Sequence, residues 1–133
     1  MNGNTVTIGK YGENIAAEYL ITQGFTITER NYRNEHREID LIAESETHIL
    51  FVEVKTRSYS GIPENSPYGR PGRAVGSTKK KLTVAAARAY LHDHPQQKQP
   101  RMDVIEVYLK KAATSTPQLI KLHWVKNAYG QNG

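Results

Sequence analysis

The sequence contains no cysteine among its 133 residues. Disulfide bridges and thiolate metal sites are therefore excluded, and packing alone must stabilise the folded chain. A chain without cysteine suits a reducing compartment, so we expect a cytoplasmic protein.

Long apolar runs are also missing. The longest, residues 49–52, is far shorter than the roughly 18 apolar residues that a membrane-spanning helix needs. Residues 1–13 lack the apolar stretch of a signal peptide, so we expect a protein that is not exported and has no membrane partner. The length fits a single domain over residues 1–133.

Acidic residues are fewer than basic ones, with 13 Asp and Glu against 18 Lys and Arg, for a net charge of +5. This balance alone is common among small proteins and only suggests an anionic partner. If Glu13, Glu38, Asp40 and Glu53 form one acidic cluster, the remaining surface carries 18 minus 9 charges, or +9, which is more typical of a nucleic-acid-binding protein.

Hydrophobic periodicity predicts seven elements in the order α, β, β, β, α, β, β. The expected helices cover residues 8–23 and 77–92, and the expected strands cover residues 25–32, 38–43, 48–57, 102–109 and 119–125. Residues 59–76 are rich in glycine and proline, which predicts a long mobile loop. The apolar stripe expected on the second helix consists of Leu82, Ala85, Ala86 and Ala89.

Charged residues interrupt two of the predicted strands. Glu38 and Asp40 occupy alternate positions of strand 38–43, and Glu53 and Lys55 do so in the apolar strand 48–57. Charges at alternate strand positions usually form a solvated face or cross-strand ion pairs. In a strand covered on both faces, however, an unpaired carboxylate costs several kcal/mol in order of magnitude, so a counter-charge is needed.

A divalent metal ion supplies such a counter-charge. Mg²⁺ or Mn²⁺ binds one or two carboxylates together with waters and phosphate oxygens, which makes Asp40 and Glu53 the expected ligands. The ion activates water and stabilises charge on phosphorus, while Lys55 is placed to hold the water or the phosphate. Glu13 shares a helical face with apolar residues and is expected to lean toward the core.

Asp40 followed after twelve residues by Glu53-Val54-Lys55 resembles the PD-(D/E)xK pattern of restriction-endonuclease-like nucleases. A broader set of motifs, spanning residues 11–129, is similar to the YraN-like family of small bacterial proteins, which resembles archaeal Holliday junction resolvases. These motifs are Tyr11-Gly12-Glu13, Arg30-Asn31-Tyr32-Arg33, Glu38-Ile39-Asp40-Leu41-Ile42, Phe51-Val52-Glu53-Val54-Lys55-Thr56-Arg57, Arg101-Met102-Asp103-Val104 and Trp124-Val125-Lys126-Asn127-Ala128-Tyr129.

The resemblance implies an α/β, restriction-endonuclease-like fold with a central mixed β-sheet flanked by helices. It also implies a metal-dependent nuclease site in which Glu13, Asp40, Glu53 and Lys55 converge, with Glu13 as a further metal ligand, and a homodimer like that of resolvases. Glu38 is a secondary candidate. Relatives have glycine where this sequence has Arg37, whose guanidinium is expected to neutralise the acidic cluster or to contact DNA.

Basic residues outside the acidic cluster are the expected phosphate contacts. They are Arg57, Arg70, Arg73, Lys79 and Lys80. Cations in the first turn of the second helix oppose its macrodipole, and a bound anion would relieve this. Residues 72–79 lack the Gly-Lys-Ser/Thr order of a phosphate-binding loop, so no nucleotide cofactor is expected.

The expected function is therefore metal-dependent endonuclease activity on DNA, selective for branched or junction structures. The first alternative is a non-catalytic nucleic-acid-binding module of the same fold that acts with DNA repair, recombination or uptake proteins. A second alternative is a structural role in which the acidic hairpin pairs with Arg30, Arg33 or Arg37.

Overall fold

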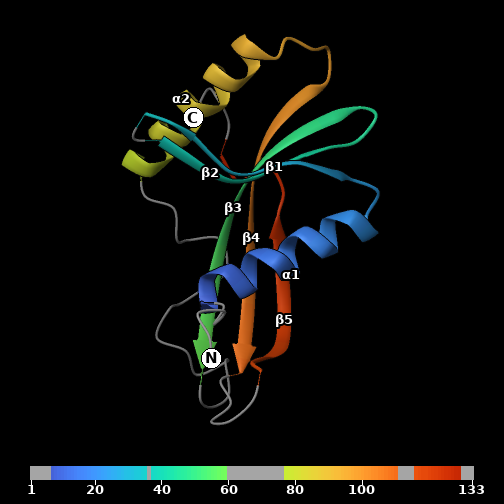
Figure 1. Ribbon diagram of the computed structural model, residues 1–133, viewed down its shortest axis with the longest axis vertical. Coiled ribbons are helices and arrows are strands. Elements are labelled where there is room, and N and C mark those ends of the chain that lie inside the picture. The colour runs from blue at the N-terminus through green and yellow to red at the C-terminus, as the bar shows by residue number, and fades with distance from the viewer. Residues whose placement is uncertain (1–6, 36, 60–76, 111–115, 130–133) are drawn as a thin grey trace, which may run out of the picture.

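The computed structural model describes residues 7–35, 37–59, 77–110 and 116–129. Its elements, in chain order, are α1 (Ile8–Thr22), β1 (Thr26–Asn34), β2 (Arg37–Glu44), β3 (His48–Tyr59), α2 (Ser77–Asp93), β4 (Gln99–Lys110) and β5 (Gln118–Val125) (Figure 1). The predicted order of elements is confirmed, and each predicted strand is present with small shifts at its ends.

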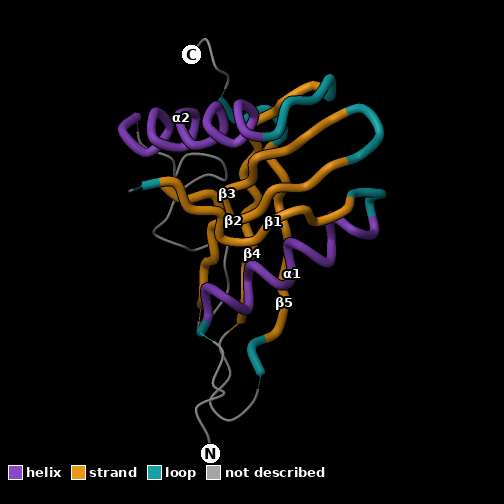
Figure 2. Tube along the Cα trace, turned by 45° about the horizontal axis from the view of Figure 1, so that its top comes forward, coloured by secondary structure: helices purple, strands orange, loops and turns teal. Residues whose placement is uncertain are grey.

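The five strands form one sheet in the order β1-β2-β3-β4-β5. The β3 and β4 strands are parallel, whereas the other neighbouring pairs are antiparallel. Parallel neighbours need a crossover connection, and α2 lies in that connection. Figure 2 shows the strands between α1 and α2. The α/β fold class is thus confirmed, and the mixed sheet with flanking helices is consistent with a restriction-endonuclease-like fold.

The α1 helix covers one face of the sheet with small and apolar side chains. Ala16, Ala17 and Leu20 are fully buried in a cluster that includes residues of β2, β3 and β4. A Cβ at Gly12 would overlap Oγ1 of Thr56 and lie 2.9 Å from its Cγ2. Glycine at this position therefore allows α1 to approach β3 closely.

The α2 helix covers the opposite face, with a different stripe from the predicted one. Its buried residues are Thr83, Ala86, Ala87 and Tyr90. The predicted stripe is wrong at Leu82, which is 42% exposed, whereas Ala86 is buried as predicted. The large Tyr90 ring contacts Tyr32 and Phe51 edge-on, at centroid distances of 5.2 and 6.0 Å, and these contacts favour the observed rotation of the helix.

Tyr59, the first residue of the predicted loop 59–76, is instead the last residue of β3. Residues 60–76 lie outside the described part of the chain. Among the residues that the structure describes, neither helix is long and apolar enough to cross a membrane.

Candidate active site

The candidate site lies where β2 separates from β3. The antiparallel pairing of these strands includes Ile42 with Phe51 and ends at Leu41 with Val52. Continued pairing would set Ile39 opposite Val54, but Oδ2 of Asp40 accepts the hydrogen bond from the Val54 amide at 2.8 Å. A carboxylate thus takes the place of a backbone acceptor, and it holds Asp40 beside the Glu53-Val54-Lys55 triplet.

Glu53 and Lys55 form an ion pair beside this carboxylate. Nζ of Lys55 lies 3.3 Å from Oε2 of Glu53, and the two side chains are 24% and 7% exposed, respectively. A carboxylate buried to this extent needs a nearby cation, and Lys55 supplies one. The ammonium also remains partly accessible, so it can contact a ligand that approaches the carboxylates.

The structure therefore brings together Asp40, Glu53 and Lys55, three of the four predicted catalytic residues. Their carboxylate oxygens match the hard-ligand preference of Mg²⁺ and Mn²⁺, and two carboxylates leave coordination positions for waters and phosphate oxygens. Within the described residues, no group of three or more His, Cys, Asp or Glu residues is arranged to hold a metal ion. A metal bound by these two carboxylates would have its remaining positions open to other oxygens, such as backbone carbonyls, waters and phosphate oxygens.

Glu13 is not brought into a three-carboxylate group with Asp40 and Glu53. Its side chain is only 17% exposed, as its helical face predicts, and its Oε1 lies 3.1 Å from Nζ of Lys10 one turn earlier in α1. The role of Glu13 as a metal ligand stays a prediction.

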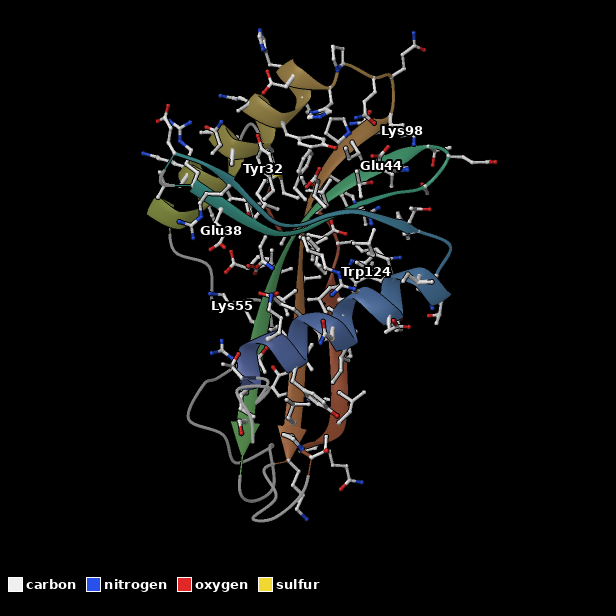
Figure 3. All side chains as sticks on the ribbon, in the orientation of Figure 1. Tyr32, Glu38, Glu44, Lys55, Lys98 and Trp124 are labelled. Atoms are coloured by element: carbon white, nitrogen blue, oxygen red, sulfur yellow. The ribbon has the colours of Figure 1, made fainter. Side chains whose placement is uncertain are left out.

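Glu38 and Arg37 take part in the β1–β2 hairpin. Glu38 is opposite Arg33 in the strand register and lies 3.7 Å from its guanidinium, with both side chains well exposed. This is the cross-strand ion pair of the structural alternative. Arg37 donates to Asn34 at 3.1 Å and pairs with Glu35 at 3.9 Å, so its guanidinium stabilises the hairpin turn. Figure 3 shows Glu38 and Lys55 on the side where α2 begins.

Two of the five predicted phosphate contacts have described side chains. Arg57 is half-buried in β3, and Nζ of Lys80 lies 5.8 Å from the centroid of the Tyr129 ring. Arg70 and Arg73 lie outside the described residues, as does the side chain of Lys79.

Sequence reasoning missed Glu106, a buried carboxylate on β4. It is 1% exposed, is opposite Lys55 in the parallel register, and accepts from the Tyr108 hydroxyl at 3.5 Å. Its signal was available, because Glu106 interrupts an apolar strand just as Glu53 does. That Glu106 lies opposite Lys55 depends on how β3 and β4 pair, and the local sequence pattern does not define this pairing.

Tyr129 was also missed, and it lies beyond every predicted strand. Burial raises the pKa of Tyr129 to about 12; the Thr83 hydroxyl offsets part of this rise, while the Glu53 and Asp40 carboxylates add to it. Tyr129 packs in one cluster with Ile39, which precedes Asp40, and with Val104, which is opposite Glu53, so its side chain flanks the acidic pair. No local pattern in the sequence predicts this proximity.

A separate shallow hollow lies near the far end of the hairpin, on the other side of the molecule from Lys55 (Figure 3). There Glu44 accepts from Lys98 and from Thr28, both at 2.8 Å. The Lys98 hydrogen bond holds the pKa of Glu44 below its ordinary value. Because Glu44 and Lys98 bond to each other, we do not assign a ligand to this hollow.

Comparison with known proteins identifies relatives along most of the chain. The model of the uncharacterised protein family UPF0102 matches residues 12–107. A UPF0102 protein of Caldanaerobacter subterraneus subsp. tengcongensis is 39% identical over 127 residues, which cover 95% of this chain and 97% of the relative. A UPF0102 protein of Clostridioides difficile is 42% identical over 102 residues, covering 76% and 84% of the two chains. The chain therefore belongs to the UPF0102 family, the YraN-like family that its motifs resemble.

Proposed function

We propose that this protein is a metal-dependent endonuclease that hydrolyses phosphodiester bonds in DNA. The observation that carries the proposal is the hydrogen bond from the Val54 amide to Asp40, because it joins the aspartate to the Glu-x-Lys triplet. An aspartate, a glutamate and a lysine held at one point on diverging strands are the groups that metal-assisted phosphodiester hydrolysis requires.

Each residue has a distinct role in this proposal. Asp40 and Glu53 hold Mg²⁺ or Mn²⁺, which when bound supplies an activated water and stabilises negative charge on the phosphate. Lys55, whose ammonium is 3.3 Å from Glu53, orients the attacking water and balances the charge of the phosphate. The Val54 amide keeps Asp40 in position before substrate arrives.

DNA is the proposed substrate because the chain is basic overall and therefore attracts a polyanion. A metal cation bound between the carboxylates would remove their repulsion of the phosphate. Selectivity for branched or junction DNA is part of the proposal. Both described helices pack their apolar faces on the sheet, so neither presents a free recognition helix to a major groove. Shape rather than base sequence is then the feature to be recognised.

Cleavage assays on linear, single-stranded, flapped and four-way-junction DNA test the proposal. We expect the purified protein to cleave junction DNA with Mg²⁺ or Mn²⁺ and to be inactive with chelator. The variants Asp40→Ala and Glu53→Ala should each lose at least about 100-fold in kcat, since each removes a proposed metal ligand. Glu38→Ala is the matched control, because it removes a nearby carboxylate that pairs with Arg33. Cleavage that survives in both ligand variants would refute the site.

A second candidate function is nucleic-acid binding without catalysis, in cooperation with repair, recombination or uptake proteins. It is favoured by the lack, among the described residues, of three acidic or histidine side chains arranged to hold a metal ion, and by the ion pair of Glu13 with Lys10. Binding of junction DNA without cleavage under every metal ion tested would support this function over the nuclease.

A further inference from the structure

The residues around the end of β5 contact both faces of the sheet. Trp124 packs at the edge of the α1-side cluster, whereas Val125, Ala128 and Tyr129 lie in or against the α2-side cluster. Asn127, between them, has a φ of 52° and so adopts the left-handed conformation of a tight turn. This turn directs Tyr129 toward the face that carries Glu53.

Asp103 fastens the turn. Its carboxylate is fully buried and accepts from Nε and Nη2 of Arg101 at 2.9 Å, from the Trp124 indole at 2.8 Å and from the Asn127 amide at 2.9 Å. The Ala128 amide then donates to the Met102 carbonyl at 2.7 Å. A carboxylate with this many donors is rigid, so the position of Tyr129 is well defined.

Tyr129 is packed among residues that flank the acidic pair. It is 6% exposed in a cluster with Ile39, Phe51 and Val104, of which Ile39 precedes Asp40 and Val104 is opposite Glu53. Among the described residues, the Tyr129 hydroxyl has no partner at full hydrogen-bonding geometry, although the Thr83 hydroxyl is near enough to lower its pKa. Buried polar atoms are normally satisfied, so a hydroxyl without a full hydrogen bond, next to residues that flank the acidic pair, is available to donate to a ligand oxygen.

A cation lies near the same ring. Nζ of Lys80, in the first turn of α2, is 5.8 Å from the Tyr129 ring centroid. An ammonium near an aromatic face is attracted by the ring quadrupole, so the ring helps to hold Lys80 beside the site. A hydroxyl donor and an ammonium at one place both favour an anion.

We propose that Tyr129 is a phosphate-binding residue of this site, whose hydroxyl donates to a non-bridging phosphate oxygen while its ring holds Lys80 near the same phosphate. The inference rests on the proposed function for its choice of a nucleic-acid phosphate. It extends that function by assigning a recognition role to a residue outside the PD-(D/E)xK pattern. The phosphate would then be contacted from two directions in the fold. The metal held by Asp40 and Glu53 would bind it from the sheet, and Tyr129 and Lys80 would bind it from the C-terminal turn and from α2.

The substitution Tyr129→Phe tests this role because it removes the hydroxyl and keeps the ring that braces Lys80. Tyr32→Phe is the matched control, since Tyr32 packs against the same cluster through contact with Tyr90. The probe is inorganic phosphate with Mg²⁺, compared with sodium chloride at equal ionic strength. The apparent dissociation constant is taken from the shift of the thermal unfolding midpoint with phosphate concentration.

We expect the dissociation constant for phosphate to rise about tenfold in Tyr129→Phe and to stay unchanged in Tyr32→Phe, as loss of one hydrogen bond to a charged group predicts. The metal-free Tyr129→Phe protein should unfold at nearly the same temperature as the wild type, because the hydroxyl makes no full hydrogen bond and the change removes only its contact with Thr83. If junction DNA is a substrate, its KM should rise more than its kcat falls.

Two results would overturn the inference. One is equal phosphate affinity in the wild type and Tyr129→Phe, and the other is a wild type that phosphate does not stabilise. If phosphate binding depends on the hydroxyl but no DNA is cleaved, the inference stands and the nuclease function falls. If DNA is cleaved but phosphate affinity is independent of the hydroxyl, the nuclease function stands and the inference falls.

Discussion

Asp40 has a structural and a proposed functional role in the same side chain. Its Oδ2 satisfies the Val54 amide where β2 leaves β3, and the same carboxylate is a proposed metal ligand. The structural role requires only an acceptor oxygen, whereas the functional role requires a negative charge. Asp40→Asn keeps an acceptor oxygen and removes the charge, whereas Asp40→Ala removes both. Comparing the two substitutions therefore distinguishes the structural role from the functional one.

We expect Asp40→Asn to abolish metal-dependent cleavage while leaving the metal-free protein at least as stable as the wild type. The amide oxygen can still accept from Val54, and the charge repulsion with Glu53 is relieved. Asp40→Ala should instead lower the free energy of unfolding by about 1–2 kcal/mol, because it leaves a partly buried amide unsatisfied. Urea unfolding in chelator measures both effects.

A loss of stability in Asp40→Asn as large as that in Asp40→Ala would contradict this separation. It would favour the structural alternative, in which the charge of the hairpin is paired for stability. The ion pairs of Glu38 with Arg33 and of Glu35 with Arg37 show that such pairing occurs elsewhere in the same hairpin.

At the scale of elements, the β1–β2 hairpin is fastened to the rest of the sheet at its far end. Glu44, the last residue of β2, accepts from Lys98 just before β4 and from Thr28 of β1. The bond to Lys98 is the largest cause of the lowered pKa of Glu44. Stability from this bond is therefore present above the ordinary pKa of 4.5 and is lost as the pH falls through the lowered pKa.

We expect Lys98→Met to lower the free energy of unfolding at pH 7 by about 0.5–1 kcal/mol, the range for partly exposed ion pairs. The difference from the wild type should shrink as the pH falls below 4.5 and Glu44 becomes protonated. Denaturant unfolding across this pH range measures the effect, with Lys81→Met, an exposed lysine of α2, as control. A difference that is constant with pH would show that the ammonium acts through something other than Glu44.

The α2 helix illustrates a limit of prediction for single elements. Its length and position follow from its own residues, but its rotation involves Tyr90 contacts with Tyr32 of β1 and Phe51 of β3. Those partners are distant in the sequence, so helical periodicity alone selected Leu82 and missed Thr83 and Ala87.

At the scale of the whole molecule, the net charge of +5 makes any nucleic-acid binding dependent on salt. A lysine or arginine contributes to the salt dependence of binding only if its side chain contacts a phosphate of the nucleic acid. Lys80 lies over Tyr129 at the site, whereas Lys98 is bonded to Glu44 on the other side of the molecule.

We expect Lys80→Gln to reduce the slope of log binding constant against log salt concentration by about one, as loss of one phosphate contact predicts. Lys98→Met should leave the slope unchanged. Fluorescence anisotropy with labelled junction DNA, in chelator to prevent cleavage, measures both slopes. Equal slopes for Lys80→Gln and the wild type would exclude Lys80 as a phosphate contact.

Local signals in the sequence are enough to predict the order of the seven elements and the Asp40, Glu53 and Lys55 candidates, because periodicity and charges within apolar strands can be recognised residue by residue. Three features come only from the folded chain: Asp40 accepts from the Val54 amide, Glu106 is opposite Lys55, and Tyr129 packs with residues that flank the site. The physical reason is that each of these depends on where strands pair and part and on how Asp103 fastens a distant turn, and such contacts leave no periodic pattern along the chain.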